Sequence, residues 1–257
     1  MVAAQAAIVA AFLAAWWFVP DWAYAHGVRY LNPYFTSSPS AVGQQIWDMA
    51  LDRNGQPEIW GFLWTTLFAA LKGAAIGIVL GGVCGLVLSH SLILRRIFMP
   101  FINIINAIPR IAFIPIVVII VGPTETSAVI TAVLVVFFLA FFSALEGGRN
   151  IAPEIVQNMQ ILGANGMQIM LDVRARYVFA WIFAALPNIL SFSVITVVTA
   201  EILTGSGGIG RLLITAVNNA DATLTFGLVA FLGLSGALIL YGAEALRRYW
   251  LHWWVSG

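Results

Sequence analysis

The feature that most limits how this chain can fold is the length of its apolar, almost uncharged stretches. Six of them approach or exceed the roughly 20 residues that an α-helix needs to cross a membrane: residues 2–19, 60–88, 97–121, 127–145, 177–200 and 226–246. Charged residues make up only 9% of the chain, too few to cover a water-soluble globule. Soluble domains usually contain about a quarter of charged residues. We therefore predict an all-α integral membrane protein with six transmembrane helices.

The N-terminal stretch, Val2–Val19, is expected to be retained as the first transmembrane helix. No Lys or Arg precedes it, whereas a signal peptide carries a basic region before its apolar one. The polar segment that follows contains turn signals at Asn32-Pro33, Ser38-Pro39 and Asn54-Gly55. Residues 1–59 are thus predicted to form an N-terminal transmembrane helix with a periplasmic segment, and residues 60–257 the core.

The distribution of arginines predicts the orientation, because positive charge collects in the cytoplasmic connections of membrane proteins. Six spans place both termini on one side, together with Arg95, Arg96, Arg149, Arg174, Arg176, Arg247 and Arg248. The opposite side holds Arg29, Arg53 and Arg211. This imbalance predicts that both termini and the long connection 146–176 lie in the cytoplasm. The net charge of +1 leaves no basic surface for nucleic acid, so membrane lipid is the expected surrounding.

A stripe of glycines runs along the second stretch. Gly73, Gly77, Gly81 and Gly85 recur every fourth residue, which places them on one face of a helix and lets a neighbouring helix approach closely. The neighbour is either another helix of the same chain or a helix of a second subunit, and the spacing alone leaves both possibilities open.

The connection 146–176 is predicted to contain two short helices. Ala152-Pro153-Glu154 is typical of a helix start. Apolar residues then recur at helical spacing as far as Leu162, and Gly163 suits a helix stop or a sharp turn. After Gly166 the periodicity resumes, so a Gly-Ala-Asn-Gly turn would join the two helices. A short amphipathic cytoplasmic helix can dock into the groove of a partner protein.

Several motifs together resemble the permease subunits of ABC importers, in particular the sulfonate, taurine and nitrate group. The motifs occur in order as Ile108-Pro109, Ala112, Pro115, Gly122, Phe141-Phe142, Gly147, Leu162-Gly163-Ala164, Ala200-Glu201 and Gly208-Ile209-Gly210. The resemblance covers roughly residues 60–250 and implies the type I ABC importer (MetI-like) permease fold in a bacterial cytoplasmic (inner) membrane.

The resemblance implies a non-catalytic subunit that forms the pathway for a small solute, with organic or inorganic anions prominent. Partner ATP-binding subunits would hold ATP and Mg²⁺, so the chain itself would bind no cofactor. An extracytoplasmic binding protein would deliver the solute, and a second permease chain, identical or different, would complete the pathway.

The resemblance also implies that a cytoplasmic coupling helix, at about residues 152–165, docks into a cleft of the ATPase. The residues assigned to this contact are Glu154, Ile155, Gln157, Met159, Leu162, Gly163, Ala164 and Asn165. Two positions depart from the family pattern. Gln157-Asn158-Met159 replaces the usual Glu-Ala-Ala, and Ala175-Arg176 replaces Leu-Pro. Either a divergent ATPase or pairing with a more typical second chain would account for these departures.

Charged residues inside predicted spans are functional candidates, because burying a charge at the centre of a membrane costs about 2.5–3.5 kcal/mol on insertion scales. Arg110 lies between Pro109 and Pro115, which are predicted to break the helix, and a broken span often lines a solute path. Arg110 either attracts an anionic solute or is a structural cation. Glu201 either caps a gate, pairs with a cation or simply ends its helix, and Lys72 is expected to extend to the interface.

The sequence also bears on other functions. The chain contains no phosphate-binding loop, no His-Glu-x-x-His and no Gly-x-Ser-x-Gly motif, which argues against an enzyme. Its three histidines and single cysteine have no metal-ligand spacing. A stand-alone secondary transporter remains the alternative function, although it would need carboxylates inside the spans and often has repeated halves.

Overall fold

The structure is a computed structural model, and it describes residues 2–28, 32–51 and 59–250. Arg29, Arg53 and the predicted Asn54-Gly55 turn lie outside the described residues. Within those ranges every regular element is helical, as predicted. Five helices are long and apolar enough to cross a membrane, and they are α1 (Val2–Ala25), α4 (Ile59–His90), α7 (Glu125–Arg149), α10 (Ala175–Thr204) and α12 (Ala222–Trp250).

The third predicted span is not a single helix. The chain instead forms α5 (Leu92–Ala107), the short 3-10 helix η2 (Arg110–Ala112) and α6 (Phe113–Val121), with a bend of 80° between the two main parts. The number of spans is six only if this bent pair counts as one. Pro109 explains the break, because it has no N–H to donate and it holds Ile108 in an extended conformation (φ −70°, ψ 130°).

Pro115, the other proline that we expected to break the third span, does not do so. It is the third residue of α6, where an N–H would have no partner within the helix, so proline is tolerated. The connection between the second and third spans is also shorter than residues 89–96, which separate the two predicted stretches. Ser91 alone separates α4 from α5, and its hydroxyl accepts a hydrogen bond from the Leu94 amide at 3.3 Å.

The prediction of two separate cytoplasmic helices is half right. The first is α8 (Pro153–Ile161). The second does not exist as a separate helix, because α9 (Gly166–Gln168) continues through the π-helix η3 (Ile169–Arg174) directly into α10. The fifth span thus begins at residue 166 and is 39 residues long. The apolar periodicity after Gly166 belongs to the membrane helix that follows.

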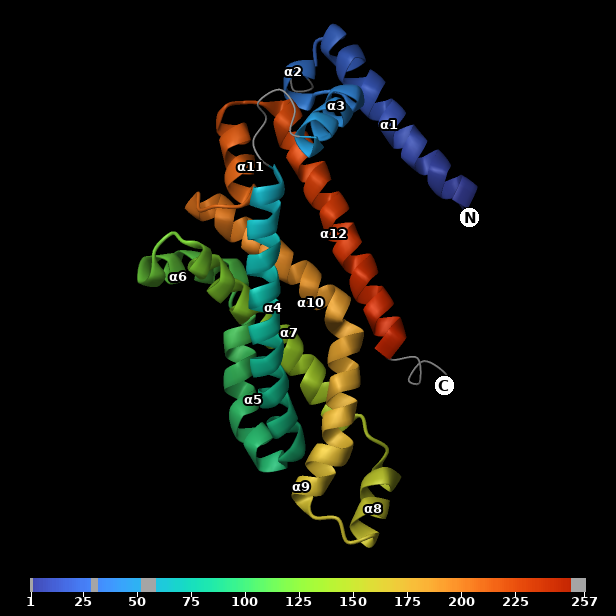
Figure 1. Ribbon diagram of the computed structural model, residues 1–257, viewed down its shortest axis with the longest axis vertical. Coiled ribbons are helices and arrows are strands. Elements are labelled where there is room, and N and C mark those ends of the chain that lie inside the picture. Colours follow the sequence, from blue (N-terminus) through green and yellow to red (C-terminus); the bar gives the residue numbers. More distant parts are fainter. Residues whose placement is uncertain (1, 29–31, 52–58, 251–257) are drawn as a thin grey trace.

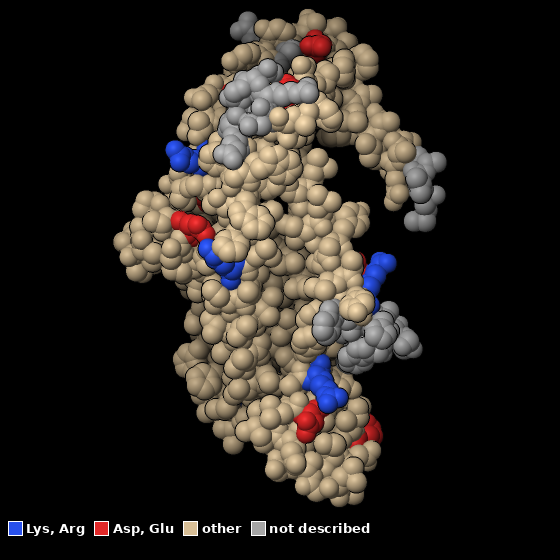
Figure 2. Space-filling view, viewed as in Figure 1, with Lys and Arg blue, Asp and Glu red and all other residues tan. Residues whose placement is uncertain are grey.

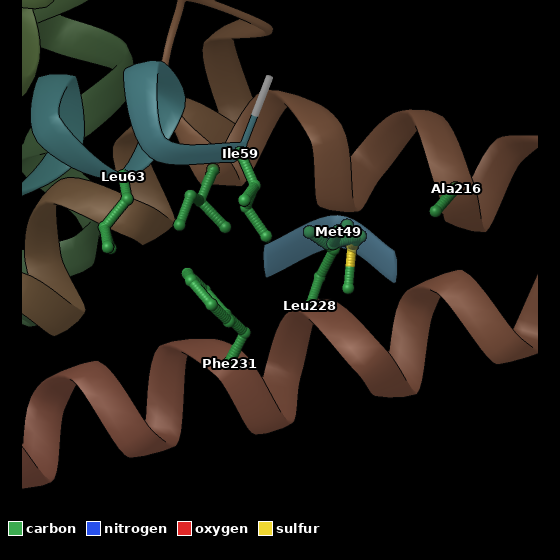
Figure 3. Close-up of a cluster of buried hydrophobic side chains, with 7 residues drawn as sticks. Met49, Ile59, Leu63, Ala216, Leu228 and Phe231 are labelled. Atoms are coloured by element: carbon green, nitrogen blue, oxygen red, sulfur yellow. The ribbon is translucent and has the colours of Figure 1, made fainter. Parts of the chain in front are cut away.

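The opposite end of the molecule is built from α2 (Pro33–Thr36), α3 (Pro39–Ala50), α11 (Ile209–Asn218) and the adjoining ends of α4 and α12 (Figure 1). The two X-Pro dipeptides that predicted turns start helices here, because proline suits the first helical position. Figure 3 shows the core of this end, where α3, α4, α11 and α12 converge on Met49, Ile59, Leu63, Ala216, Leu228 and Phe231.

The N-terminal end of α1 and the C-terminal end of α12 both point away from the end of the molecule that contains α2 and α3 (Figure 1). Helix α1 is splayed from the bundle and is attached near its C-terminal part, where the Trp16 indole donates to the Thr36 carbonyl at 3.0 Å. Most of the face shown in Figure 2 is free of charged side chains, as a membrane protein requires.

Helices α4 and α7 form the most intimate contact of the structure, and the glycine stripe lies in it. A methyl group added at Gly73 or Gly85 would come within 2.5–2.6 Å of Ala132 or Ala144 of α7. At Gly77 it would lie 2.7 Å from Val136. The stripe therefore packs against a helix of the same chain, which decides between the two possibilities left open by the spacing.

We predict that Gly81→Ala destabilises the protein by about 1–3 kcal/mol, the usual cost of overpacking a tight contact. The new methyl group would overlap the Phe137 carbonyl oxygen and lie 2.9 Å from the Phe141 amide nitrogen, both of them backbone atoms that cannot turn away. The measurement is the unfolding free energy in mixed detergent micelles. Gly242→Ala in α12 is the matched control, because its methyl group would meet nothing within 4 Å; equal stability of the two variants would contradict the prediction.

Candidate functional site

Helix α8 projects from the end of the molecule opposite α2 and α3, beside α9 (Figure 1). Pro153 at its first position and Glu154 in its first turn favour a helix start at this point. The helix contacts only η3 to a significant extent, and none of its side chains is buried. It is therefore a short helix held at the surface of the described chain.

The outward face of α8 differs from the one that the sequence predicted. Val156 and Met159 are half-buried, so the side that carries Met159 faces the protein itself. Ile161 lies on the opposite side and is 82% exposed, and the adjoining Leu162 is 81% exposed. Sequence reasoning missed Ile161, although its spacing of seven from Glu154 places the two on one helical face. Glu154, Gln157 and Asn158 surround it and are exposed.

Gly163 ends α8 in the way that a left-handed glycine usually ends a helix. Its φ is +84°. The Ala164 amide donates to the Met159 carbonyl at 2.9 Å, and the Gly163 amide donates to the Gln160 carbonyl at 3.0 Å. These are the two hydrogen bonds of a Schellman motif. Because nothing lies within 4 Å of a methyl group at this position, the backbone conformation, and not space, is what selects glycine.

Asn165 starts the next helix immediately. Its side-chain oxygen accepts from the Gln168 amide at 2.9 Å, and the Gln168 side-chain oxygen accepts from the Asn165 amide at 2.8 Å. This reciprocal capping box satisfies two donors that a helix start otherwise leaves free. Only residues 162–165 separate α8 from the continuous helix that becomes α10, so both helix ends in this connection are held by specific hydrogen bonds.

A second candidate site lies at the break of the third span. A cavity of about 380 Å³ lies between the α5–α6 bend and α10, with Asn106, Pro109 and Arg110 on one wall and Thr196 and Thr199 on the other. The Arg110 guanidinium donates to the Asn106 side-chain oxygen at 3.0 Å. Among the described residues no carboxylate lies within ion-pair distance of Arg110. The guanidinium thus retains donors for an anion in this cavity.

Glu201 is the most deeply buried carboxylate of the described chain, with only 2% of its surface exposed. The Thr66 hydroxyl of α4 donates to its two oxygens at 2.9 and 3.0 Å, and the Gly210 amide of α11 donates at 2.9 Å. The Ile209 amide in turn donates to the Thr66 hydroxyl at 2.9 Å. We call these four residues the Glu201 cluster, and it ties α4, α10 and α11 together.

Two glycines make room for the Glu201 cluster. Gly208 has a φ of +98°, and a methyl group on it would overlap the Glu201 carboxylate. A methyl group on Gly210 would lie 2.5 Å from the Glu201 Cβ. The acid and the glycines of the predicted motif therefore act together in space. We allowed that Glu201 pairs with a cation, but in the structure its carboxylate accepts hydrogen bonds from a hydroxyl and an amide instead.

The predicted pathway residues do not all meet. Pro109 and Arg110 line one cavity, Glu201 lies in its own cluster, and Pro115 is exposed on α6. Lys72 pairs with Glu125 at 2.9 Å and its ammonium lies 4.2 Å from the centre of the Phe68 ring. Its role is local, because both partners are about half exposed. No group of three or more metal-ligating side chains occurs in the parts of the chain that the structure describes.

Comparisons with known proteins agree with this architecture. The family model described as "Binding-protein-dependent transport system inner membrane component" matches residues 77–251. The putative aliphatic sulfonates transport permease protein SsuC of Escherichia coli (strain K12) is 26% identical over 242 residues, 92% of this chain and 90% of the relative. The nitrate import permease protein NrtB of Leptolyngbya laminosa is 23% identical over 207 residues, 78% of this chain and 74% of the relative.

A solved structure agrees with the fold. A chain of the MetNI methionine ABC transporter in an inward-facing conformation has a TM-score of 0.66 at 20% identity, covering 74% of this chain and 95% of that one. Together with these matches, the fold identifies this chain as a multi-pass membrane permease subunit of an ABC transporter. It belongs to the family of inner membrane components of binding-protein-dependent transport systems. The predicted resemblance to the sulfonate, taurine and nitrate group is confirmed.

We predict that Glu201→Ala loosens α11 from the bundle. Leaving a buried donor without its acceptor costs about 1–3 kcal/mol, and this change affects both Thr66 and Gly210. The measurement uses a cysteine in place of Ala216, which is 1% exposed in α11, in a Cys84→Ala background. This cysteine should react with maleimide at least about tenfold faster when Glu201 is replaced by Ala than when Glu201 is kept, the equivalent of 1.4 kcal/mol.

Glu201→Gln keeps one acceptor oxygen, so its rate of maleimide labelling should lie between those of the parent protein and of Glu201→Ala. Thr215→Val is the control, because the Thr215 hydroxyl donates only to the Arg211 carbonyl of its own helix. If Glu201→Ala labels no faster than this control, the Glu201 cluster does not hold α11.

Proposed function

We propose that this chain forms the translocation pathway of an ABC importer for a small anionic solute. The relatives named for aliphatic sulfonates and for nitrate support an anion as the solute. In this proposal an extracytoplasmic binding protein delivers the solute to the end of the molecule that contains α2, α3 and α11. Both termini and α8 face the cytoplasm of the bacterial cell, in agreement with the arginine distribution.

The chain itself is not catalytic in this proposal. ATP and Mg²⁺ bind to partner ATPase subunits, and the chain receives mechanical work from them through α8. The exposed surface of α8 is the observation that carries the proposal. Ile161 and Leu162 present apolar surface to water at 82% and 81% exposure, and such surface at the end of a permease is suited to a partner's cleft.

The coupling contact uses the exposed residues of α8 and its turn. Glu154, Gln157 and Ile161 form the outward face, with Ile155 and Leu162 at its edge, while Met159 supports the helix from the inner side. Gly163, Ala164 and Asn165 form the tight turn that joins α8 to α10. The usual Glu-Ala-Ala of the family is replaced here, so apolar packing around Ile161 carries more of the docking energy than charge.

The solute passes the cavity at the break of the third span. Arg110 supplies the only charge among the described residues that line it, and Thr196 and Thr199 line it from α10. Pro109 makes the bend that places Arg110 in the cavity. Ile111 and Ile195 at the cavity are 63% and 59% exposed, apolar surface that a second permease chain, identical or different, would cover.

We predict that Ile161→Asp prevents the ATPase from co-purifying with the permease, because a carboxylate would have to be buried in an apolar contact. The measurement is the amount of ATPase recovered with the tagged permease from the native membrane. Gln44→Asp adds the same charge at an exposed position of α3, at the other end of the molecule. The ATPase should co-purify with this variant in full. Solute uptake by the purified permease without any ATPase would instead support a stand-alone secondary transporter.

We predict that Arg110→Gln reduces uptake of the anionic solute about tenfold or more, which corresponds to losing the roughly 1.5–3 kcal/mol of a hydrogen bond to a charged group. Arg110→Lys should retain part of the uptake because it keeps the charge without the planar fork. The assay uses proteoliposomes that contain the complete transporter. Arg248→Gln, at a side chain that is 78% exposed, is the control, and equal uptake by the Arg110→Gln and Arg248→Gln variants would contradict the role.

A further inference from the structure

The C-terminal ends of α4 and α7 pack closely against each other and against the beginning of α10. A methyl group on Gly148, near the C-terminus of α7, would overlap the Ser89 hydroxyl at the C-terminus of α4. A methyl group on Gly147 would lie 2.8 Å from the Trp181 side chain of α10. The end of α7 therefore lies directly against the Ser89 side chain of α4 and the Trp181 side chain of α10, with only glycine on its own side of each contact.

Arg174 bridges these ends. Its guanidinium Nη1 donates to the Gly148 carbonyl of α7 at 2.5 Å and to the Ser89 carbonyl of α4 at 3.2 Å. Carbonyl groups in the last turn of a helix have no N–H partner within the helix. The C-terminus of a helix also carries partial negative charge, so a cation is favourable there. One arginine thus satisfies two helix ends at once.

The position of Arg174 in the chain gives this bridge its significance. Arg174 is the last residue of η3, the π-helix that connects α9 to α10. A π-helical turn is rare, and it is often associated with functional sites. The path from α8 to the membrane therefore runs through the Gly163 turn, the Asn165 cap and η3, and it reaches the bundle at Arg174.

We propose that Arg174 is a positioning residue that locks the base of α10 to α4 and α7, so that a displacement of α8 moves the helix bundle and is not absorbed by bending at η3. The proposal rests on the proposed function, in which α8 is the part that the ATPase moves. Both hydrogen bonds come from one guanidinium nitrogen, Nη1, whose two N–H groups lie in the fixed plane of the guanidinium. A lysine ammonium lacks this fixed plane, because it is a point charge on a flexible stem.

The first test measures the rigidity of the joint in the purified permease. Spin labels on cysteines in place of Gln157, exposed on α8, and Val87, 40% exposed on α4, are introduced in a Cys84→Ala background. A narrow distance distribution is expected for the parent protein and a clearly broader one for Arg174→Met. Arg176→Met is the matched control, because it removes the same charge two residues away from an exposed position.

The second test measures coupling in proteoliposomes with the ATPase and the binding protein. Arg174→Met should keep ATP hydrolysis but lower the solute transported per ATP by about fivefold or more, which is within the usual range of coupling between sites. The solute transported per ATP by Arg174→Lys should fall between the values of the parent and of Arg174→Met. If Arg174→Met does not fold, Arg174→Lys takes its place in the comparison with the parent. The Arg176→Met variant should match the parent.

The outcomes separate this proposal from the proposed function. An unchanged distance distribution in Arg174→Met overturns the clamp whether or not an ATPase binds. A broader distribution with an unchanged transport ratio overturns its part in coupling. If the parent protein neither binds the ATPase nor takes up solute, the proposed function fails, while the distance measurement still decides whether Arg174 holds the joint.

Discussion

The close contact between α4 and α7 is the constraint on which the rest of the structure depends. Lipid tails are as apolar as leucine, so helices in a membrane gain little from hydrophobic burial and associate through close packing instead. The four glycines of α4 remove the side chains that would keep the two backbones apart. Small residues on α7, such as Ala132, Ala140 and Ala144, complete the contact and are fully buried. Helices α5, α6, α10 and α11 contact this pair directly.

Helix α10 is attached to α4 by polar contacts along its length. Arg174 reaches the Ser89 carbonyl at one end, and Glu201 accepts from Thr66 at the other. Between them the buried Ser193 hydroxyl donates to the Ala70 carbonyl at 2.7 Å. A helix held at three levels moves with its neighbour. In the proposed function, this arrangement would transmit a displacement of α8 to α10, which lines the Arg110 cavity.

The bent third span has the opposite character. Pro109 ends α5 and leaves α6 too short to cross a membrane, since nine residues extend only about 13 Å. Irregular backbone at this depth needs protein or water around it, and the adjoining cavity provides such a place. Among the described residues that line the cavity, the charge comes from Arg110, directly after the proline. The bend and the charge are therefore consequences of two neighbouring residues.

The sequence by itself determined the class of protein, five of the six membrane-spanning stretches, the α8 helix with its glycine stop, and the family, because these depend on composition, periodicity and local backbone preference. It also predicted that Pro109 would break a helix, a local effect of a missing N–H. It did not reveal that Pro115 would be harmless, because that depends on how far into α6 the residue lies. Nor did it show that the segment after Gly166 is the start of α10.

Only the tertiary structure decided which partners the polar and small residues have. The glycine spacing of α4 could not distinguish α7 from a second subunit, and nothing adjacent in sequence indicated that Glu201 would meet Thr66, 135 residues away. In the sequence Arg174 was one of seven arginines predicted to be cytoplasmic, and only the packed structure places the ends of α4 and α7 beside it. Local sequence specifies where helices begin and end, whereas the contacts between them depend on all the helices packing at once.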